Sequence, residues 1–372
     1  MGTKLTIRDI ARLAGVSKST VSRVLNQSAS VDAATRELVL RVMKQHDFIP
    51  SIAATGLRGR SKLIGVIVPA LTWELMLEII MSIGQVIEKT PYEIILYCCP
   101  AEKDYSEIVD RILATKLIGG LLAMNNAQSL EHLIALHEQG LPVVLVNTPA
   151  TRVNLPLVVA ANYSGAYQAV RHLLQLGHRR IAYIQGPLAF ACCHDRYQGY
   201  CDALRDVGLS FDPVLCQQGH FSSNSGRVAA EALFALDEPP TAIFAGNDHT
   251  AYGVLDVAKE RGIRIPEDVA LVGFDDIPPS AQTHPALTTI HQPFRDMGRC
   301  ATELLLSLLD PQYVFPSHWA SFAASYLPSG TLNSEEEEGM EKPLQIQLPT
   351  NLVVRESCGI VSADEARLVV EM

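Results

Sequence analysis

The stretch LTIRDIARLAGVSKSTVSRVLN, residues 5–26, decides the fold of the N-terminal part of this chain. Thr6 is placed to cap a first helix, because its hydroxyl can accept a hydrogen bond from a free amide of the first turn. Ala14-Gly15-Val16 predicts a tight break, in which glycine adopts a backbone angle that other residues avoid. Ser17 is placed to cap a second helix. The pattern therefore predicts a helix-turn-helix unit.

Each of these two helices has an apolar face. The inward side chains are Ile7, Ile10, Ala11 and Leu13 on the first helix, and Val21, Val24 and Leu25 on the second. The outward side chains of the second helix are Lys18, Ser19, Ser22 and Arg23. A short polar helix of this kind fits the major groove of DNA and meets base edges near its N-terminus.

A third helix is expected from about Ala33 to Gln45, with Asp32 as its cap. Its apolar face consists of Leu38, Val39, Val42 and Met43. The segment that follows, residues 48–62, contains a short helix that Pro50 can open. Thr55 and Gly56 weaken that helix, so we expect it to order only when another molecule holds it.

The charge of the chain is divided unevenly. Residues 1–62 carry eleven basic and four acidic side chains, a net charge of +7, whereas the whole chain has a net charge of −10. The remainder is therefore strongly acidic. A basic head on an acidic body is typical of a DNA-binding protein with a separate effector module.

Length and composition exclude several classes of protein. A chain of 372 residues is long enough for two or three domains with their own cores. The sequence contains neither an apolar run long enough to span a bilayer nor a signal-peptide pattern, which predicts a cytoplasmic protein. The eight cysteines form no C-x-x-C pair, and neither they nor the eleven histidines have metal-ligand spacing.

From Leu63 onward, apolar runs alternate with amphipathic segments. The runs cover 63–69, 92–98, 117–124 and 141–147, followed by a second series at 155–160, 180–186, 241–246 and 268–275. Expected helices separate the first series at 74–89, 104–115 and 129–139. Continuous apolar runs are typical of buried parallel strands. The two series predict two doubly wound α/β lobes, with a ligand bound between them at the strand ends.

The head closely resembles the lactose-repressor (LacI/GalR) family of bacterial transcription factors. The matching residues are TIRDIARLAGVSKSTVSRVLN, VDAATRELVLRVMKQHDFIP, SIAATGLR and IGVIVP, and the body matches in DRYQGYCDAL and TAIFAGNDHTAYGVLDVAKERGIRIPEDVALVGFDD. The resemblance implies a helix-turn-helix head joined to a periplasmic-binding-protein-like core of two doubly wound parallel-sheet lobes.

The resemblance also implies the domain boundaries. They are a DNA-binding domain at 1–47, a hinge at 48–62 and an effector-binding and dimerisation core at 63–372. Within the core we expect one lobe at about 63–161 and 293–348 and the other at about 162–292 and 349–372. An insertion relative to the family covers about 312–343 and includes YVFPSHWASFAASY and a run of four glutamates. Its aromatic part is expected to cover a surface or a partner interface.

The family implies which residues of the head meet DNA. Lys18, Ser19 and Arg23 are the expected base-reading residues, and Arg23 can donate two hydrogen bonds to a guanine. Leu57 matches the hinge leucine that wedges into the minor groove, although a lone leucine in a linker can equally be a minor core contact. The expected phosphate or capping contacts are Thr6, Ser17, Thr20, Ser22 and Asn26.

The expected effector contacts lie at strand ends of the second lobe. Arg196 and Asp275 match positions that contact effector in the family, and Phe221 matches a position that packs an aromatic ring against it. Asn247 and Asp248 follow a strand, but they can instead serve only to cap the next helix. Trp73 follows the first strand of the body and offers a flat face to a sugar or a base, unless it is simply core. Asn147 and Asn162 stand where relatives usually have Asp, which alters the ligand that fits.

The sequence thus predicts a transcriptional regulator, a repressor that binds a palindromic operator as a homodimer. It uses no cofactor or metal and responds to a small polar effector, with a sugar or sugar derivative as the first expectation and a purine or nucleoside as the second. A sugar-binding protein without a regulatory role is the first rival, and the basic head argues against it. An enzyme is the second rival. Cys192-Cys193-His194 is its one tempting constellation, but sequence neighbours seldom have the geometry for proton transfer.

Overall fold

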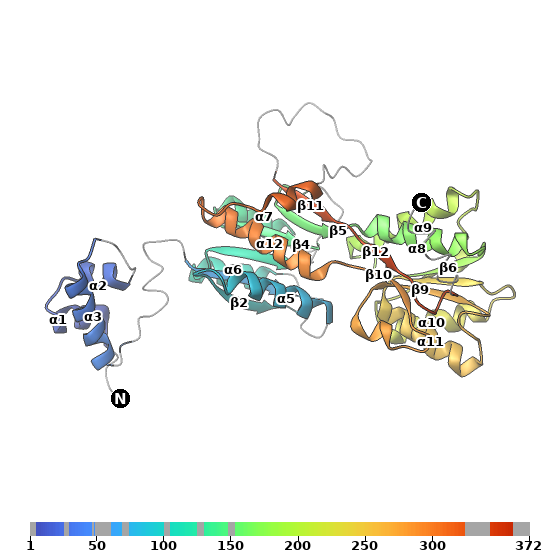
Figure 1. The fold of residues 1–372 in the computed structure, drawn as a ribbon, viewed down its shortest axis with the longest axis horizontal. Helices are drawn as coiled ribbons and strands as arrows, with labels where there is room; N and C mark the ends of the chain where they lie inside the picture. The colour runs from blue at the N-terminus through green and yellow to red at the C-terminus, as the bar shows by residue number, and fades with distance from the viewer. Residues whose placement is uncertain are drawn as a thin grey trace, which may run out of the picture.

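The structure is a computed structural model that describes residues 5–25, 30–46, 48, 61–68, 74–99, 105–124, 130–147, 153–323 and 343–359. Its N-terminal unit consists of helices α1 (Ile7–Leu13), α2 (Lys18–Leu25) and α3 (Ala33–Gln45), drawn in blue in Figure 1. These helices share a hydrophobic cluster of their own, in which Ile10, Val21 and Val39 are fully buried.

The predicted caps of this unit are confirmed. Thr6 caps α1 in a reciprocal capping box, in which the Asp9 carboxylate accepts a hydrogen bond from the Thr6 backbone amide. Gly15 adopts the expected positive φ of 64° in the turn, and the Asp32 carboxylate caps α3 by accepting from the Thr35 amide.

Two leucines of the head were placed wrongly in the predicted core. Leu13 is 44% exposed and Leu38 is 40% exposed. Leu13 directly precedes the buried Ala14 and therefore points roughly 100° away from it around α1. Leu38 directly precedes the buried Val39 and therefore points roughly 100° away from it around α3.

The first lobe is built on a six-stranded parallel sheet with the order β11-β5-β4-β3-β1-β2. Its strands are β1 (Leu63–Val68), β2 (Glu93–Cys98), β3 (Gly120–Met124), β4 (Val143–Val146), β5 (Leu157–Ala160) and β11 (Gln345–Leu348). Its helices are α5 (Glu74–Ile87), α6 (Ser106–Thr115), α7 (Leu130–Glu138) and α12 (Phe294–Leu309). Four of these strands match the first series of apolar runs.

The second lobe repeats this plan with the order β12-β10-β9-β8-β6-β7. Its strands are β6 (Ile181–Gln185), β7 (Cys216–Gln218), β8 (Ala242–Ala245), β9 (Ala270–Asp275), β10 (Thr288–His291) and β12 (Asn351–Val353). Its helices are α8 (Asn162–Gln175), α9 (Ala191–Arg205), α10 (Ser223–Phe234) and α11 (Asp248–Arg261), with 3-10 turns η3 (Pro213–Leu215) and η4 (Pro278–Ala281). The edge strand β12 runs antiparallel to β10, and the other five strands are parallel, as expected for a doubly wound lobe.

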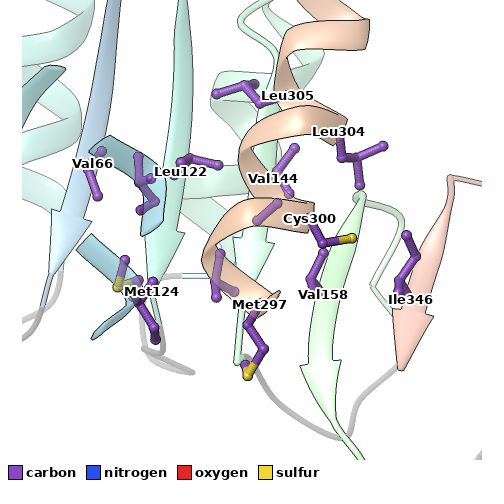
Figure 2. Close-up of a cluster of buried hydrophobic side chains, with 14 of the residues drawn as sticks. Val66, Leu122, Met124, Val144, Val158, Met297, Cys300, Leu304, Leu305 and Ile346 are labelled. Carbon is purple, nitrogen blue, oxygen red and sulfur yellow. The ribbon is translucent and has the colours of Figure 1, made fainter. Parts of the chain in front are cut away.

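Each sheet is covered on both faces, because the central strands have hydrophobic side chains on both sides. In the first lobe α5 and α12 cover one face, and α6 and α7 cover the other. In Figure 2 the side chains of Met297, Cys300 and Leu304 on α12 lie against the strands of the first lobe. In the second lobe α8 and α9 pack on one face, and α10 and α11 on the other.

The chain passes between the lobes three times. It leaves β5 at Ala160 for α8, leaves β10 at His291 for α12, and leaves β11 at Leu348 for β12. All three exits are at the carboxyl ends of parallel strands, so the carboxyl edges of the two sheets face the region where the segments cross (Figure 1). Ligands of open α/β sheets bind at such edges.

One further expectation needs correction, and part of the insertion can be placed. The run at 92–98 was expected to be a buried strand, but β2 is an edge strand in which Leu96 is 42% exposed. The insertion packs partly into the first lobe: Trp319, in the 3-10 turn η5 (Ser317–Phe322), is buried and donates a hydrogen bond to Glu303 on α12. Ala323 then pairs with Ile346 of β11, so this segment covers that edge of the sheet. The glutamate run lies outside the described residues.

Candidate functional site

The outer face of α2 is polar and exposed. Lys18, Ser19 and Arg23 project from it into solvent. The Ser17 hydroxyl accepts a hydrogen bond from the Thr20 amide at 3.0 Å, which fixes the first turn of the helix. Its oxygen also lies 2.7 Å from Ser19 Oγ and 2.8 Å from Thr20 Oγ1, so these hydroxyls form one connected group. Hydroxyls at a helix N-terminus are suited to phosphate contact.

A buried charged pair lies at the carboxyl edge of the second lobe's sheet. Arg196 on α9 and Asp275 at the end of β9 are 3% and 5% exposed, and Arg196 Nη2 lies 3.7 Å from Asp275 Oδ1. Arg196 Nε donates to Asn162 Oδ1 at 3.0 Å, and Nη1 donates to the Gly246 carbonyl. The guanidinium also stacks 3.6 Å from the centre of the Phe274 ring. These contacts hold Arg196 in one orientation.

Asp275 is held in an unusual backbone conformation. Its φ is 121° and that of Asp276 is 57°, angles that most residues avoid. Its Oδ1 accepts a hydrogen bond of 2.6 Å from Gln292 Nε2. Burial raises the pKa of Asp275 to about 6, and the Arg196 guanidinium and the Gln292 amide limit the rise. The group therefore changes charge close to physiological pH.

Asn247 and Asp248 are engaged inside the second lobe. Asn247 caps α11, because its Oδ1 accepts from the Thr250 amide at 2.9 Å, while its Nδ2 lies 3.4 Å from the Phe221 carbonyl. Asp248 is fully buried, and its carboxylate accepts from the Ile277 amide, Ser280 Oγ and Thr289 Oγ1. Burial and then the charge of Asp275 raise the pKa of Asp248 to about 8. Both residues therefore have an evident role in holding the site together.

An aromatic pair borders the buried charges. The ring centroids of Phe221 and Phe190 lie 6.1 Å apart, and that of Phe221 lies 5.8 Å from Arg196 Cζ. Phe221 has a φ of 57°, and its carbonyl faces the Asn247 amide. A Cβ at Gly186 would lie 2.2 Å from the Phe221 ring, so only glycine leaves room for this ring position. The aromatic face thus lies beside the charged pair.

Several predicted residues lie outside the described part of the chain. They are Asn26, Leu57 and Trp73. The structure adds two residues that sequence reasoning missed, Phe190 and Gln292. Phe190 directly precedes α9, the helix that carries Arg196. This position in the sequence could have indicated that its ring lies near Arg196. Gln292 follows β10, a strand of four residues that is too short to show periodicity.

In the segment Cys192-Cys193-His194, His194 Nε2 lies 2.9 Å from the Leu188 carbonyl oxygen, and Cys193 is fully buried. No group of three potential metal ligands occurs among the described residues. Within the same residues, no helix is both long and apolar enough to cross a bilayer.

Comparisons with known proteins agree with this architecture. Residues 6–51 match the bacterial regulatory proteins of the lacI family, and residues 170–324 match a periplasmic binding protein-like domain. The chain is 34% identical over 313 residues to the HTH-type transcriptional repressor CytR of Escherichia coli K12, which spans 84% of this chain and 92% of that protein. The chain belongs to the LacI family.

Solved structures of LacI-family proteins share its fold. The lac repressor dimer bound to operator and the anti-inducer ONPF superposes with a TM-score of 0.76 at 27% identity, covering 96% of this chain and 100% of that one. The complex of the transcriptional regulator CelR with cellobiose gives a TM-score of 0.64 at 28% identity, covering 95% and 99%. This LacI-family chain is therefore a DNA-binding transcriptional regulator with an effector-binding core.

Proposed function

We propose that this LacI-family regulator is a homodimeric repressor whose effector is a small polyhydroxylated molecule, a sugar or sugar derivative, held by Arg196 and Asp275. The buried charged pair at the carboxyl edge of the second sheet carries the proposal. Arg196 Nη2 and Asp275 Oδ1 lie 3.7 Å apart, which is longer than a strong hydrogen bond. Both groups can therefore still form hydrogen bonds with a ligand. A hydroxyl can donate to the carboxylate while a neighbouring oxygen accepts from the guanidinium.

Two observations support the effector class. The Phe190 and Phe221 rings offer an apolar face beside the charges, which suits the C–H face of a sugar ring. The CelR protein, which has the same fold, was solved with cellobiose. The same aromatic face can stack on a base, which keeps a purine or nucleoside as the second candidate. The proposal assigns the chain no catalytic step.

The dimer proposal rests on an exposed apolar surface of the first lobe. Leu77 and Met81 on α5 are 50% and 55% exposed, and Leu96 on the neighbouring edge strand β2 is 42% exposed. They lie on elements that pack against each other. Palindromic operators require two heads related by two-fold symmetry, and an isologous contact through this surface supplies that symmetry.

A ligand panel tests the effector class. Titration calorimetry with cellobiose, D-ribose, adenosine, uridine and free guanine is expected to show binding of at least one hydroxyl-bearing ligand and none of the free base. A bound ligand at one hundred times its Kd is expected to stabilise the protein by about 2.7 kcal/mol. Binding of a nucleoside or of guanine, with neither sugar bound, would contradict the sugar proposal and favour the second candidate. Asp275→Asn is the control, because it keeps the shape of the site and removes its charge.

Effector binding is expected to weaken in acid. The pKa of Asp275 is about 6. An effector that donates to the carboxylate therefore loses about tenfold in affinity per pH unit once the pH is well below 6. Because the folded pKa of Asp275 lies above its unfolded value, protonation of this group does not itself destabilise the fold. Titrations at pH 5 to 8 measure the effect, and a flat profile in the wild type would contradict it. Asp275→Asn should remove this dependence.

A further inference from the structure

We propose that Cys192 and Cys193 form a redox-sensing dithiol, in which a hydroperoxide oxidises Cys192 and Cys193 then closes a disulfide with it. The two residues are consecutive in the first turn of α9, and their thiols are hydrogen-bonded to each other. Cys192 is partly exposed, whereas Cys193 is fully buried. A Cβ at Gly186 would lie 2.8 Å from Cys193 Sγ, so the glycine leaves the room that this thiol occupies behind Cys192. An accessible thiol next to a second thiol is typical of redox-sensing cysteines.

Cys192 is the thiol that favours its reactive, ionised form. The hydrogen bond from the Cys193 thiol and the positive charge of Arg196 lower the pKa of Cys192. Burial and the carboxylates of Asp195 and Asp275 oppose this fall without cancelling it. The same hydrogen bond, together with burial, raises the pKa of Cys193, so this thiol keeps its proton. Because the thiolate is the nucleophile, Cys192 is the residue that attacks a peroxide.

The reaction has two steps. The Cys192 thiolate attacks one oxygen of hydrogen peroxide, the O–O bond breaks, and hydroxide leaves while the sulfur becomes a sulfenic acid. The Cys193 sulfur then displaces the hydroxyl group of the sulfenic acid, which leaves with the Cys193 proton as water. The two thiols are thereby oxidised to a disulfide, and the peroxide is reduced to water. A thiol reductant reverses the change by disulfide exchange.

The disulfide does not fit a regular helix. Consecutive Cα atoms lie about 3.8 Å apart, whereas disulfides usually join Cα atoms about 4.4–6.8 Å apart. Consecutive side chains also point roughly 100° apart around a helix. The first turn of α9 must therefore unwind when the bond closes. Because each amide of an α-helix donates to the carbonyl four residues earlier, the Arg196 amide then loses its partner at Cys192.

This unwinding reaches the candidate effector site. Arg196 lies one turn after Cys192, and its guanidinium faces Asp275. Phe190, whose ring lies beside Phe221, directly precedes the same turn. Oxidation thus loosens both site residues that this end of α9 positions, and it is expected to weaken effector binding. That consequence rests on the proposed function of the Arg196–Asp275 site, whereas the dithiol chemistry does not.

Peroxide treatment of the reduced full chain tests the chemistry. After addition of hydrogen peroxide, the tryptic peptide that contains Cys192 and Cys193 is expected to lack two hydrogens in wild type and to regain them with a thiol reductant. Cys193→Ser should stop at a Cys192 sulfenic acid, which dimedone traps, and Cys192→Ser should give neither product. Cys98→Ser is the matched control, because Cys98 is exposed and also precedes a cysteine, and it should react as wild type does. Absence of the disulfide in wild type would overturn the proposal.

Hydrogen exchange tests the link to Arg196. The Arg196 amide is expected to exchange at least about tenfold faster in oxidised than in reduced wild type, and peroxide should leave its exchange unchanged in Cys192→Ser. Equal exchange in oxidised and reduced wild type would overturn the link between the dithiol and the site. Oxidation should also raise the Kd of the tightest ligand of the panel at least about tenfold. Failure of every panel member to bind reduced wild type would overturn the proposed effector class alone, because the peptide masses and the exchange rates do not depend on a ligand.

Discussion

Arg196→Met is expected to abolish the effector response while the protein still binds operator DNA. The substitution removes the donors to Asn162 and Gly246 and leaves Asp275 buried without its cation. Removing one partner of a buried ion pair costs about 3–5 kcal/mol when the other must stay charged. Because Arg196 lowers the pKa of Asp275, its loss should raise that pKa further, so the carboxyl becomes neutral and accepts a ligand hydroxyl more weakly than a carboxylate does.

The measurement is operator affinity with and without the best ligand of the panel. We expect a ligand-dependent change in wild type and none in Arg196→Met. Arg205→Met is the matched control, because Arg205 lies on the same helix but is exposed and pairs only with Asp202. Exposed pairs of this kind contribute about 0–1 kcal/mol, so this variant should respond normally. A normal response in Arg196→Met would remove Arg196 from the site.

Arg23→Ala is expected to lose operator discrimination. Arg23 is exposed on the outer face of α2, where it can reach a base edge in the major groove. A bidentate contact to guanine supplies about 1–3 kcal/mol of discrimination, which corresponds to about 5–150-fold between operator and unrelated DNA. Competitive gel shifts with the chain's own promoter and a scrambled duplex measure this ratio.

Arg12→Ala is the control for that experiment. Arg12 is equally basic and exposed, but it lies at the end of α1 and pairs with Asp9. Its loss should weaken binding to all duplexes alike, because a phosphate contact carries no sequence information. If Arg23→Ala keeps the full ratio of operator to scrambled DNA, the assignment of α2 as the reading helix is wrong.

Most of the framework could be predicted from residues that lie close together in the sequence. The caps at Thr6 and Asp32 and the turn at Gly15 depend on spacings of three or four residues, and the structure confirms them. The long apolar runs gave eight of the strands. The strands β7, β10 and β12, with three or four residues each, were missed because so few residues show no periodicity.

The interior of the candidate site could not be predicted in the same way. The donors to the Asp248 carboxylate come from Ile277, Ser280 and Thr289, about 30 to 40 positions along the chain. The sequence placed Asp248 at a strand end but could not show that its carboxylate oxygens already accept hydrogen bonds from other residues of the lobe. Gln292 was missed for the same reason, since only the fold brings it to Asp275.

The three crossings of the chain between the lobes also affect how the protein folds during its synthesis. A ribosome makes the chain from its N-terminus, and α12 and β11 emerge only after nearly the whole second lobe. Until then the first sheet lacks the edge strand β11 and one of the two helices that cover one of its hydrophobic faces. The lobe that is begun first is thus completed only near the end of synthesis, and a nascent chain halted near residue 292 would expose that face to chaperones and to aggregation.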